Sequence, residues 1–209
     1  MSARGLQGLY AITDAALTPD PQLVPAVEAA IRGGARLVQY RDKSGDAVQR
    51  LDEAGALAAL CRGHGVTFVV NDDVELALES GADGVHLGRD DASLAAARVR
   101  LGPRALIGVS CYDSLPQAVT AAHGGADYVA FGSFYASGSK PGAVRAPLEL
   151  LTRARRELSI PVCAIGGITP ENGAALIAAG ADMLAVIRGL FAAEDVTSAA
   201  QRYARLFRS

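Results

Sequence analysis

One short motif recurs along the chain, and it constrains the fold more than any other feature. A glycine and an alanine, then aspartate or arginine, then an apolar run occur at residues 33–38, 80–85, 124–129 and 179–184. Each copy is typical of a helix that ends at a glycine with left-handed backbone angles, followed by a polar turn and a new strand. The copies lie about 45 to 55 residues apart, a spacing of about two βα units.

Further apolar runs lie between these turns. The predicted strands span residues 9–13, 37–40, 68–70, 84–87, 106–109, 128–131, 162–165 and 183–187. Most lack a polar–apolar alternation, as expected of parallel strands that are buried on both faces. Stretches rich in Ala and Leu predict helices between them, for example at residues 49–61, 94–100, 174–179 and 198–207.

Eight alternating units favour an α/β fold of one domain over residues 1–209, namely a closed (βα)₈ TIM barrel with an eight-stranded parallel sheet. An open sheet of the flavodoxin type is the alternative, although eight strands are many for it. No GxGxxG turn for a dinucleotide follows the first predicted strand. No linker or low-complexity segment divides the chain.

Composition narrows the class of protein. Twenty basic residues against 22 acidic ones leave a net charge of −2, which argues against a polybasic nucleic-acid binder. No apolar run approaches the ~20 residues of a membrane span, and the start resembles no signal peptide. Cys61, Cys111 and Cys163 form no CxxC pair, so neither a disulfide framework nor a zinc site is indicated. We expect a soluble cytoplasmic protein with small-molecule partners and no nucleic-acid or membrane partner. The sequence leaves open whether the chain forms a homo-oligomer.

In such a barrel the active site lies at the carboxyl ends of the strands, so the residues after each strand are the candidates. The segment Gln39-Tyr40-Arg41-Asp42-Lys43 contains two cations and an amide that could bind an anion. A plain solvated loop explains this segment equally well. Asn71-Asp72-Asp73 and the acidic Asp90-Asp91 follow neighbouring strands. Each group alone is typical of a helix cap. Together they could bring two carboxylates to one Mg²⁺ ion.

The later loops suggest a phosphate site. Residues 131–142 combine serines, glycines and Lys140, and glycines follow both of the last two strands. Backbone N–H groups, hydroxyls and a lysine suit a phosphate. Ser110 at a strand tip is weak evidence, and Cys111 as a nucleophile is improbable because no histidine is placed to activate it. We interpret His86 as a hydrogen-bonded residue of the core or behind the site, and His64 and His123 as helix-end residues.

Taken in order, these segments resemble the thiamine phosphate synthase family. The resemblance rests on residues 39–43, 71–77, 84–91, 108–110, 137–140 and 165–168, and it covers nearly the whole chain. It implies a transferase that joins the diphosphate of 4-amino-5-hydroxymethyl-2-methylpyrimidine to 4-methyl-5-(2-hydroxyethyl)thiazole phosphate, or to its carboxylated form. The products are thiamine phosphate and diphosphate. It also implies Mg²⁺ and a dissociative step that needs no protein nucleophile.

The resemblance assigns roles to individual residues. Arg41, Lys43, Ser110 and Lys140 would be catalytic. The pyrimidine diphosphate site would contain Gln39, Tyr40, Arg41, Asp42, Lys43, Asn71, Ser110 and Lys140. The thiazole phosphate site would contain Ser137, Gly138, Ser139, Gly167, Ile187 and Arg188. The metal ligands would be Asp72 and Asp91.

Two positions depart from the family pattern. The loop at residues 136–140 lacks the usual Pro-Thr, and Arg188 stands where the family commonly has serine. We expect affinity for the thiazole phosphate to be kept or changed modestly. The alternatives are an isomerase of the thiazole tautomerase type on the same barrel, a non-catalytic protein that binds thiamine precursors, and a generic sugar-phosphate barrel enzyme.

Overall fold

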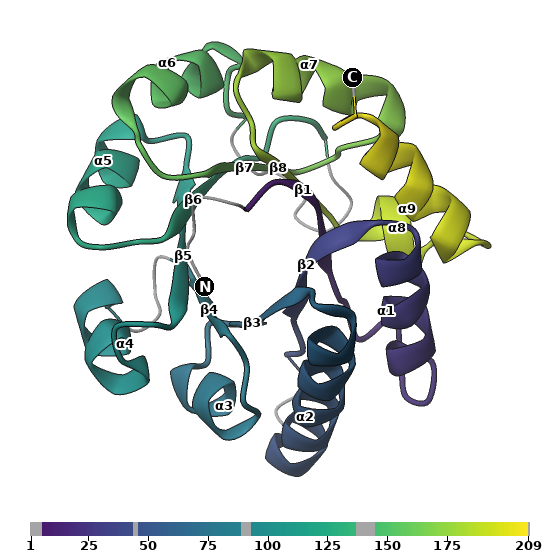
Figure 1. The fold of residues 1–209 in the computed structure, drawn as a ribbon. Coiled ribbons are helices and arrows are strands. Elements are labelled where there is room, and N and C mark those ends of the chain that lie inside the picture. Colours follow the sequence, from purple (N-terminus) through teal and green to yellow (C-terminus); the bar gives the residue numbers. More distant parts are fainter. Residues whose placement is uncertain (1–5, 44–45, 89–92, 137–144, 209) are drawn as a thin grey trace.

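The computed structural model describes residues 6–43, 46–88, 93–136 and 145–208. Its parallel strands close into a barrel in sequence order, with β1 paired to β8, so the open-sheet alternative is wrong. The strands are Gly8–Ile12 (β1), Ala35–Tyr40 (β2), Thr67–Asn71 (β3), Gly84–Leu87 (β4), Leu106–Tyr112 (β5), Tyr128–Phe131 (β6), Val162–Ile165 (β7) and Met183–Val186 (β8). Figure 1 shows the helices as a ring around this closed sheet.

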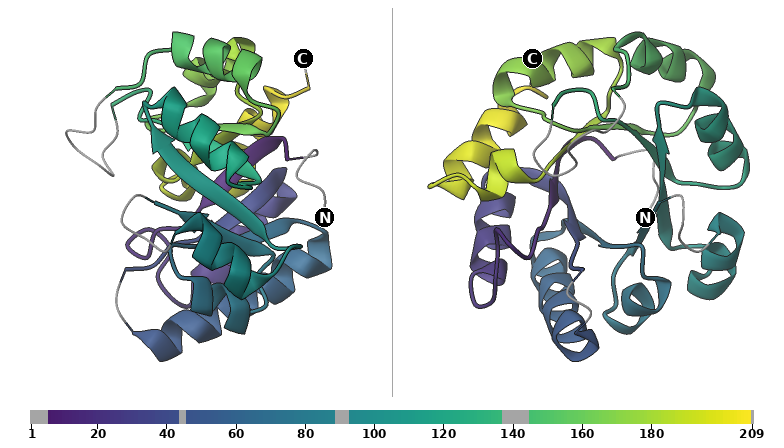
Figure 2. Two further views of the ribbon diagram at one scale, coloured as in Figure 1. Left: turned by 90° about the vertical axis from the view of Figure 1, so that its left-hand side faces the viewer. Right: turned by 180° about the vertical axis from the view of Figure 1, so that it is seen from behind.

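The helices follow the strands as predicted. They are Leu23–Arg32 (α1), Ala47–His64 (α2), Val74–Glu79 (α3), Leu94–Leu101 (α4), Leu115–His123 (α5), Glu149–Glu157 (α6), Pro170–Ala179 (α7), Arg188–Phe191 (α8) and Val196–Arg205 (α9). In the side view of Figure 2 they cover the outer face of the sheet. None of the described helices is long and apolar enough to cross a membrane.

The fifth strand is longer than predicted. It ends at Tyr112 rather than at residue 109, so Ser110 lies within the strand. The pairing of β5 with β6 shifts between Ser110 and Tyr112, and Tyr112 has a φ of 54°. The apolar run ends at Val109, and for that reason the composition of the segment did not predict this irregular extension.

The barrel has two cores because successive strand residues face opposite sides of the sheet. Tyr10, Leu37, Val69 and Tyr128 belong to a small cluster inside the barrel. The much larger cluster lies between the sheet and the helices and includes residues such as Val38. Every strand therefore has one set of side chains that can reach a ligand in the barrel and another set that holds the helices.

The recurring motif has a structural role at the amino ends of the strands. The carboxylates of Asp83, Asp127 and Asp182 each accept a hydrogen bond from a backbone N–H of the preceding strand, at 2.8, 2.8 and 2.9 Å. The glycine of each copy has a positive φ, at Gly34, Gly81, Gly125 and Gly180. We call the three aspartates the aspartate clamps, because each ties one strand to the next.

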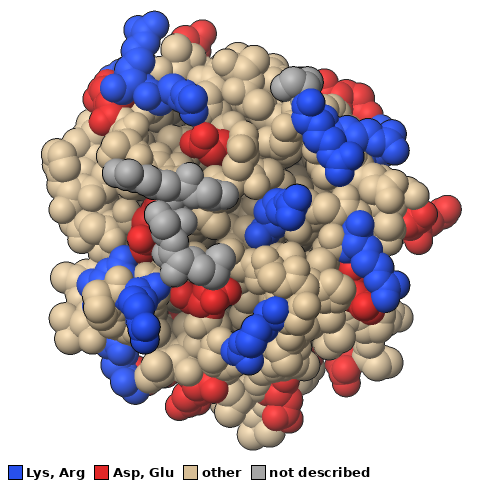
Figure 3. Space-filling model, viewed as in Figure 1, with Lys and Arg blue, Asp and Glu red and all other residues tan. Residues whose placement is uncertain are grey.

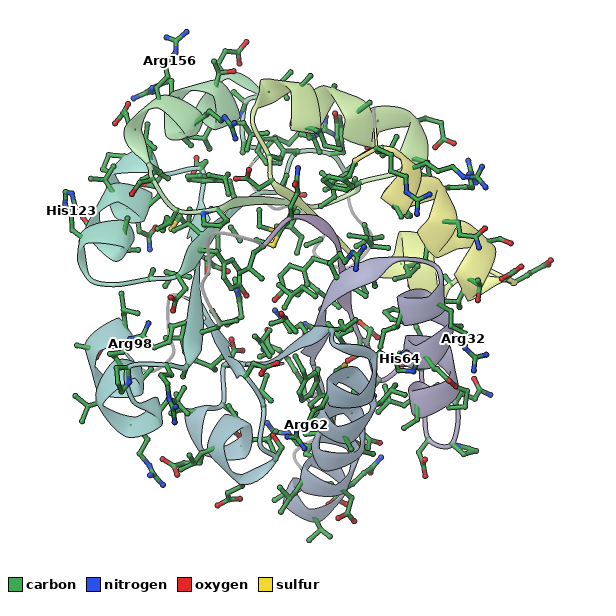
Figure 4. All side chains as sticks on the ribbon, in the orientation of Figure 1. Arg32, Arg62, His64, Arg98, His123 and Arg156 are labelled. Atoms are coloured by element: carbon green, nitrogen blue, oxygen red, sulfur yellow. The ribbon has the colours of Figure 1, made fainter. Side chains whose placement is uncertain are left out.

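The end at which the strands begin faces the viewer in Figures 1, 3 and 4. Acidic and basic side chains are mixed around its rim in Figure 3. The basic residues labelled in Figure 4 lie in the last turns of helices α1, α2, α4, α5 and α6: Arg32, Arg62, His64, Arg98, His123 and Arg156. Positive charge at a helix C-terminus is stabilised by the helix dipole. The predicted helix-end positions of His64 and His123 are confirmed.

Candidate active site

The carboxyl end of the barrel brings polar side chains together from several strands. Gln39 on β2, His86 on β4 and Ser110 on β5 point into the barrel, where they are linked by hydrogen bonds through two tyrosines. Asn71 ends β3 two residues after Val69 of the inner cluster, so its side chain has the same inward parity. Four neighbouring strands, β2 to β5, thus present polar groups at one mouth.

The last two residues of β2, Gln39 and Tyr40, point to opposite sides of the sheet. The hydroxyl of Tyr40 donates a hydrogen bond to Glu53 of α2 at 2.6 Å, which places this side chain on the helix side. Burial and the neighbouring Glu53 carboxylate raise the pKa of Tyr40 well above its usual value. Tyr40 therefore does not join the inward-facing residues, and only its backbone is available to a ligand in the barrel.

Two cations follow Tyr40, and each lies near a carboxylate. The guanidinium of Arg41 is 3.5 Å from Asp14, and its backbone N–H donates to the hydroxyl of Thr13 at 2.9 Å. The Lys43 ammonium is exposed and lies 4.0 Å from the carboxylate of Asp72. Ion pairs that are accessible to water and this long contribute little, so an incoming anion could draw either cation away from its carboxylate.

A pocket of about 390 Å³ opens beside Arg41, on the helix side of the sheet. Its walls come from the loop after β1 and from the start of α2. They include Thr18, Tyr40, Arg41, Asp42 and Glu53. Asp42 thus faces this pocket, and of the predicted thiazole-site residues that the structure describes, Gly167, Ile187 and Arg188, none lines it.

Asp72 has an unusual backbone conformation. Its φ is 66°, and its N–H donates to the backbone oxygen of His86 at 2.8 Å. A positive φ is uncommon outside glycine, and strained residues cluster at functional sites. Asp73 is different: it accepts from the N–H of Leu76 as the N-cap of α3 and pairs with Arg50 at 3.0 Å. The capping interpretation thus holds for Asp73, while the Asp72 carboxylate stays at the barrel mouth.

The predicted thiazole side is built around Gly166 and Gly167, both with positive φ. A side chain at Gly167 would clash with the backbone oxygen of Ala136, because a Cβ there would lie 2.3 Å away. The backbone N–H of Tyr135 also donates to the oxygen of Gly166 at 3.0 Å. The start of the loop after β6 therefore packs directly against the turn after β7.

The other predicted site residues fall into two groups. Ile187 is partly buried and packs on the inner cluster, whereas Arg188 is exposed at the start of the short helix α8. Asp91 and the loop residues Ser137, Gly138, Ser139 and Lys140 lie outside the described residues, so their placement stays a prediction. Among residues that the structure does describe, no cluster of three or more His, Cys, Asp or Glu side chains could hold a metal ion.

The cysteines are not poised for chemistry. All three are buried and free, and burial raises the pKa of Cys61 and of Cys111 to about 12. A thiol in that state is a poor nucleophile because the thiolate is the reactive form. The interpretation of Cys111 as structural thus agrees with its environment.

Sequence reasoning did not identify the buried tyrosines behind the site. Tyr10 and Tyr128 lie inside the barrel, with ring centroids 6.1 Å apart in an edge-to-face contact. They connect Gln39 on one side to His86 on the other. The prediction of His86 as a buried, hydrogen-bonded residue is confirmed. The one available signal was that each tyrosine is polar and occupies an otherwise apolar strand.

Comparison with known proteins identifies the family of this chain. A family model described as thiamine monophosphate synthase matches residues 9–190. A thiamine-phosphate synthase of Thioalkalivibrio sulfidiphilus is 57% identical over 202 residues, covering 97% of this chain and 96% of the relative. One from Acidithiobacillus ferrooxidans is 58% identical over 205 residues, covering 97% and 94%.

A solved structure adds the fold. The thiamine phosphate pyrophosphorylase of Pyrococcus furiosus superposes with a TM-score of 0.89 at 35% identity, covering 98% of this chain and 97% of that one. The match thus extends over nearly the whole length of both chains. Since the family model spans most of the chain and relatives of such identity share nearly its full length, this chain belongs to the thiamine monophosphate synthase family.

Proposed function

We propose that this protein is a thiamine-phosphate synthase with the substrates that the family resemblance implies. It would transfer the pyrimidinylmethyl group from its diphosphate to the nitrogen of the thiazole phosphate. The observation that carries the proposal is the mouth formed by Gln39, Asn71 and Ser110, with Arg41 and Lys43 at the same end. The relatives named thiamine-phosphate synthase support it.

The main requirement of this reaction is stabilisation of the leaving diphosphate. The bond between the pyrimidine methyl carbon and the diphosphate oxygen breaks with its electron pair on the diphosphate. The lone pair of the thiazole nitrogen then forms the new C–N bond. Charge builds up on the departing diphosphate, so preorganised cations and hydrogen-bond donors lower the barrier. Arg41, Lys43 and Lys140 would bind that charge, and no protein nucleophile is required.

Asp72 suits a magnesium ion. It offers a hard carboxylate oxygen at the mouth, one third exposed, and Mg²⁺ is commonly bound by one or two carboxylates together with substrate phosphates. Asp91, which follows the neighbouring strand, would be the second carboxylate. When bound, the ion would neutralise charge on the diphosphate.

An assay with both substrates and Mg²⁺ tests the proposal, with thiamine phosphate and diphosphate measured as separate products. We expect both products in equal amounts, loss of activity with EDTA, and a drop of more than a hundredfold for Asp72→Ala, in line with ~3 kcal/mol of lost charge stabilisation. Asp52→Ala, which removes an exposed carboxylate from α2, is the matched control and should leave turnover unchanged.

Two outcomes would contradict this assignment. Near-normal turnover of Asp72→Ala would remove the metal role of that residue. Conversion of a thiazole phosphate without release of diphosphate, and without sensitivity to EDTA, would favour an isomerase instead.

A further inference from the structure

A chain of hydrogen bonds runs across the inside of the barrel. The side-chain amide of Gln39 donates to the hydroxyl of Tyr10, which lies 2.9 Å from the hydroxyl of Tyr128. That hydroxyl is 3.0 Å from Nδ1 of His86, and Nε2 of His86 is 2.9 Å from Oγ of Ser110. These five residues come from five strands, and the first four are at most 8% exposed.

One direction of donation gives the protons of both tyrosines an acceptor among the described residues. Each hydroxyl carries one proton. Tyr10 accepts from Gln39, so its own proton goes to Tyr128, its other partner among the described residues. Tyr128 accepts that proton and donates its own to Nδ1 of His86. A neutral imidazole that accepts at Nδ1 carries its proton on Nε2, and this N–H donates to Ser110.

Burial keeps both tyrosine hydroxyls protonated. Desolvation raises the pKa of Tyr10 and of Tyr128 well above their usual values, so both hydroxyls keep their protons at any working pH. Space for the chain depends on Gly108, because a Cβ at that position would lie 2.1 Å from the ring of Tyr128. The glycine on the neighbouring strand thus leaves the space that the Tyr128 ring occupies.

At the last position of this series of hydrogen bonds, the hydroxyl of Ser110 still has its own proton to donate. Its oxygen already accepts from His86, and it lies partly buried at the mouth, on β5. The hydroxyl can therefore give its proton to a group that enters the barrel. An acceptor there, such as a phosphate oxygen or a ring nitrogen, fits this geometry.

We propose that His86 is a positioning residue that orients the Ser110 hydroxyl so that it donates its hydrogen bond toward the substrate. The chain from Gln39 through the two tyrosines selects the Nε2–H tautomer of His86, and this tautomer orients the serine. The inference rests on the proposed function, because it assumes that the pyrimidine substrate reaches Ser110.

The tautomer can be measured without any substrate. Nitrogen and carbon NMR shifts of the His86 ring in the purified protein should report a neutral Nε2–H imidazole at pH 7.5. Tyr128→Phe removes the donor to Nδ1 and should convert the signal to a mixture of tautomers, while Ser110→Ala should leave the Nε2–H form in place. A Nδ1–H ring or an imidazolium in the wild type would overturn the proposal, as would an unchanged spectrum in Tyr128→Phe.

Turnover gives the second test, with a matched pair of variants. The amide nitrogen of glutamine can occupy the position of Nε2, and that of asparagine the position of Nδ1. His86→Gln should therefore retain kcat within about fivefold, and His86→Asn should lose about tenfold to a hundredfold, the range for one hydrogen bond to a polar group in the site. KM for the pyrimidine substrate should change less than kcat.

A double-mutant comparison separates positioning from a structural role. In a Ser110→Ala background, His86→Gln and His86→Asn should have equal activities, because the hydroxyl to be positioned is gone. Equal losses in both backgrounds would refute the proposal. If the wild type formed no thiamine phosphate at all, the proposed function would fail, yet the NMR measurement would still decide the tautomer.

Discussion

Replacing Asp127 should destabilise the protein without slowing its reaction. This aspartate clamp accepts from the backbone N–H of Ile107 at 2.8 Å and from the guanidinium of Arg98 at 2.6 Å. Ile107 is fully buried, so Asp127→Ala leaves an N–H unpaired away from water. Such a group costs about 1–3 kcal/mol, and the partly exposed ion pair adds up to about 1 kcal/mol.

The sum, about 3 kcal/mol, translates into a measurable shift. For a chain of about 200 residues, 1 kcal/mol corresponds to about 2–4 °C in Tm, so Asp127→Ala should melt about 6–12 °C below the wild type. Asp127→Asn keeps an acceptor for Ile107 and should lose about a third of that amount. Asp52→Ala on exposed α2 should stay within about 0.5 kcal/mol of wild type.

Differential scanning calorimetry together with steady-state kinetics at 25 °C would test this. The clamps lie at the end where strands begin, opposite the candidate site, so kcat and KM of Asp127→Ala should match the wild type below its transition. A Tm within 2 °C of the wild type would refute the hydrogen-bond reasoning. A tenfold fall in kcat at full folding would refute the separation of the two ends.

Three further predictions concern single side chains. Arg188→Ser should change KM for the thiazole phosphate less than tenfold, because Arg188 is exposed; an improvement of more than tenfold in steady-state assays would show the arginine to be unfavourable. Tyr40→Phe should cost about 1 kcal/mol in chemical denaturation through its lost bond to Glu53, with kcat nearly unchanged, and a large loss of kcat would place its hydroxyl in the chemistry. Because burial raises the pKa of Cys61 and Cys111 to about 12, both thiols stay protonated up to pH 10. A thiol reagent at pH 8 should therefore modify neither in the folded protein, and rapid labelling would contradict that burial.

Much of the fold could be predicted from the sequence because its signals are local. The strands at Gly84–Leu87, Tyr128–Phe131 and Val162–Ile165 have the predicted bounds, since an aspartate or a proline precedes each strand and a glycine follows it. The end of β5 was wrong because Ser110 and Tyr112 continue the strand through an irregular pairing with β6. Such a pairing depends on a partner strand and not on the composition of the segment.

The site was predictable to the extent that it follows from a position at or near the carboxyl end of a strand. Gln39, Asn71 and Ser110 occupy the barrel end for that reason. The helix-side location of Tyr40 could also have been predicted from the sequence, because strand residues alternate between the two faces and its neighbour Gln39 points inward. The hydrogen bond between Tyr10 and Tyr128 could not be predicted from the sequence, since the two residues are 118 positions apart and only barrel closure brings them together.

The irregular end of β5 has a consequence for the chemistry of the mouth. Ser110 faces the barrel, and Cys111 beside it is fully buried among the helix-side residues. Sliding this strand by a single position would exchange the two, so that the sulfur of Cys111 would face the barrel where the hydroxyl of Ser110 now does. Deletion of one residue between Leu106 and Val109 would thus put sulfur in the place of oxygen, without replacing any amino acid at the site.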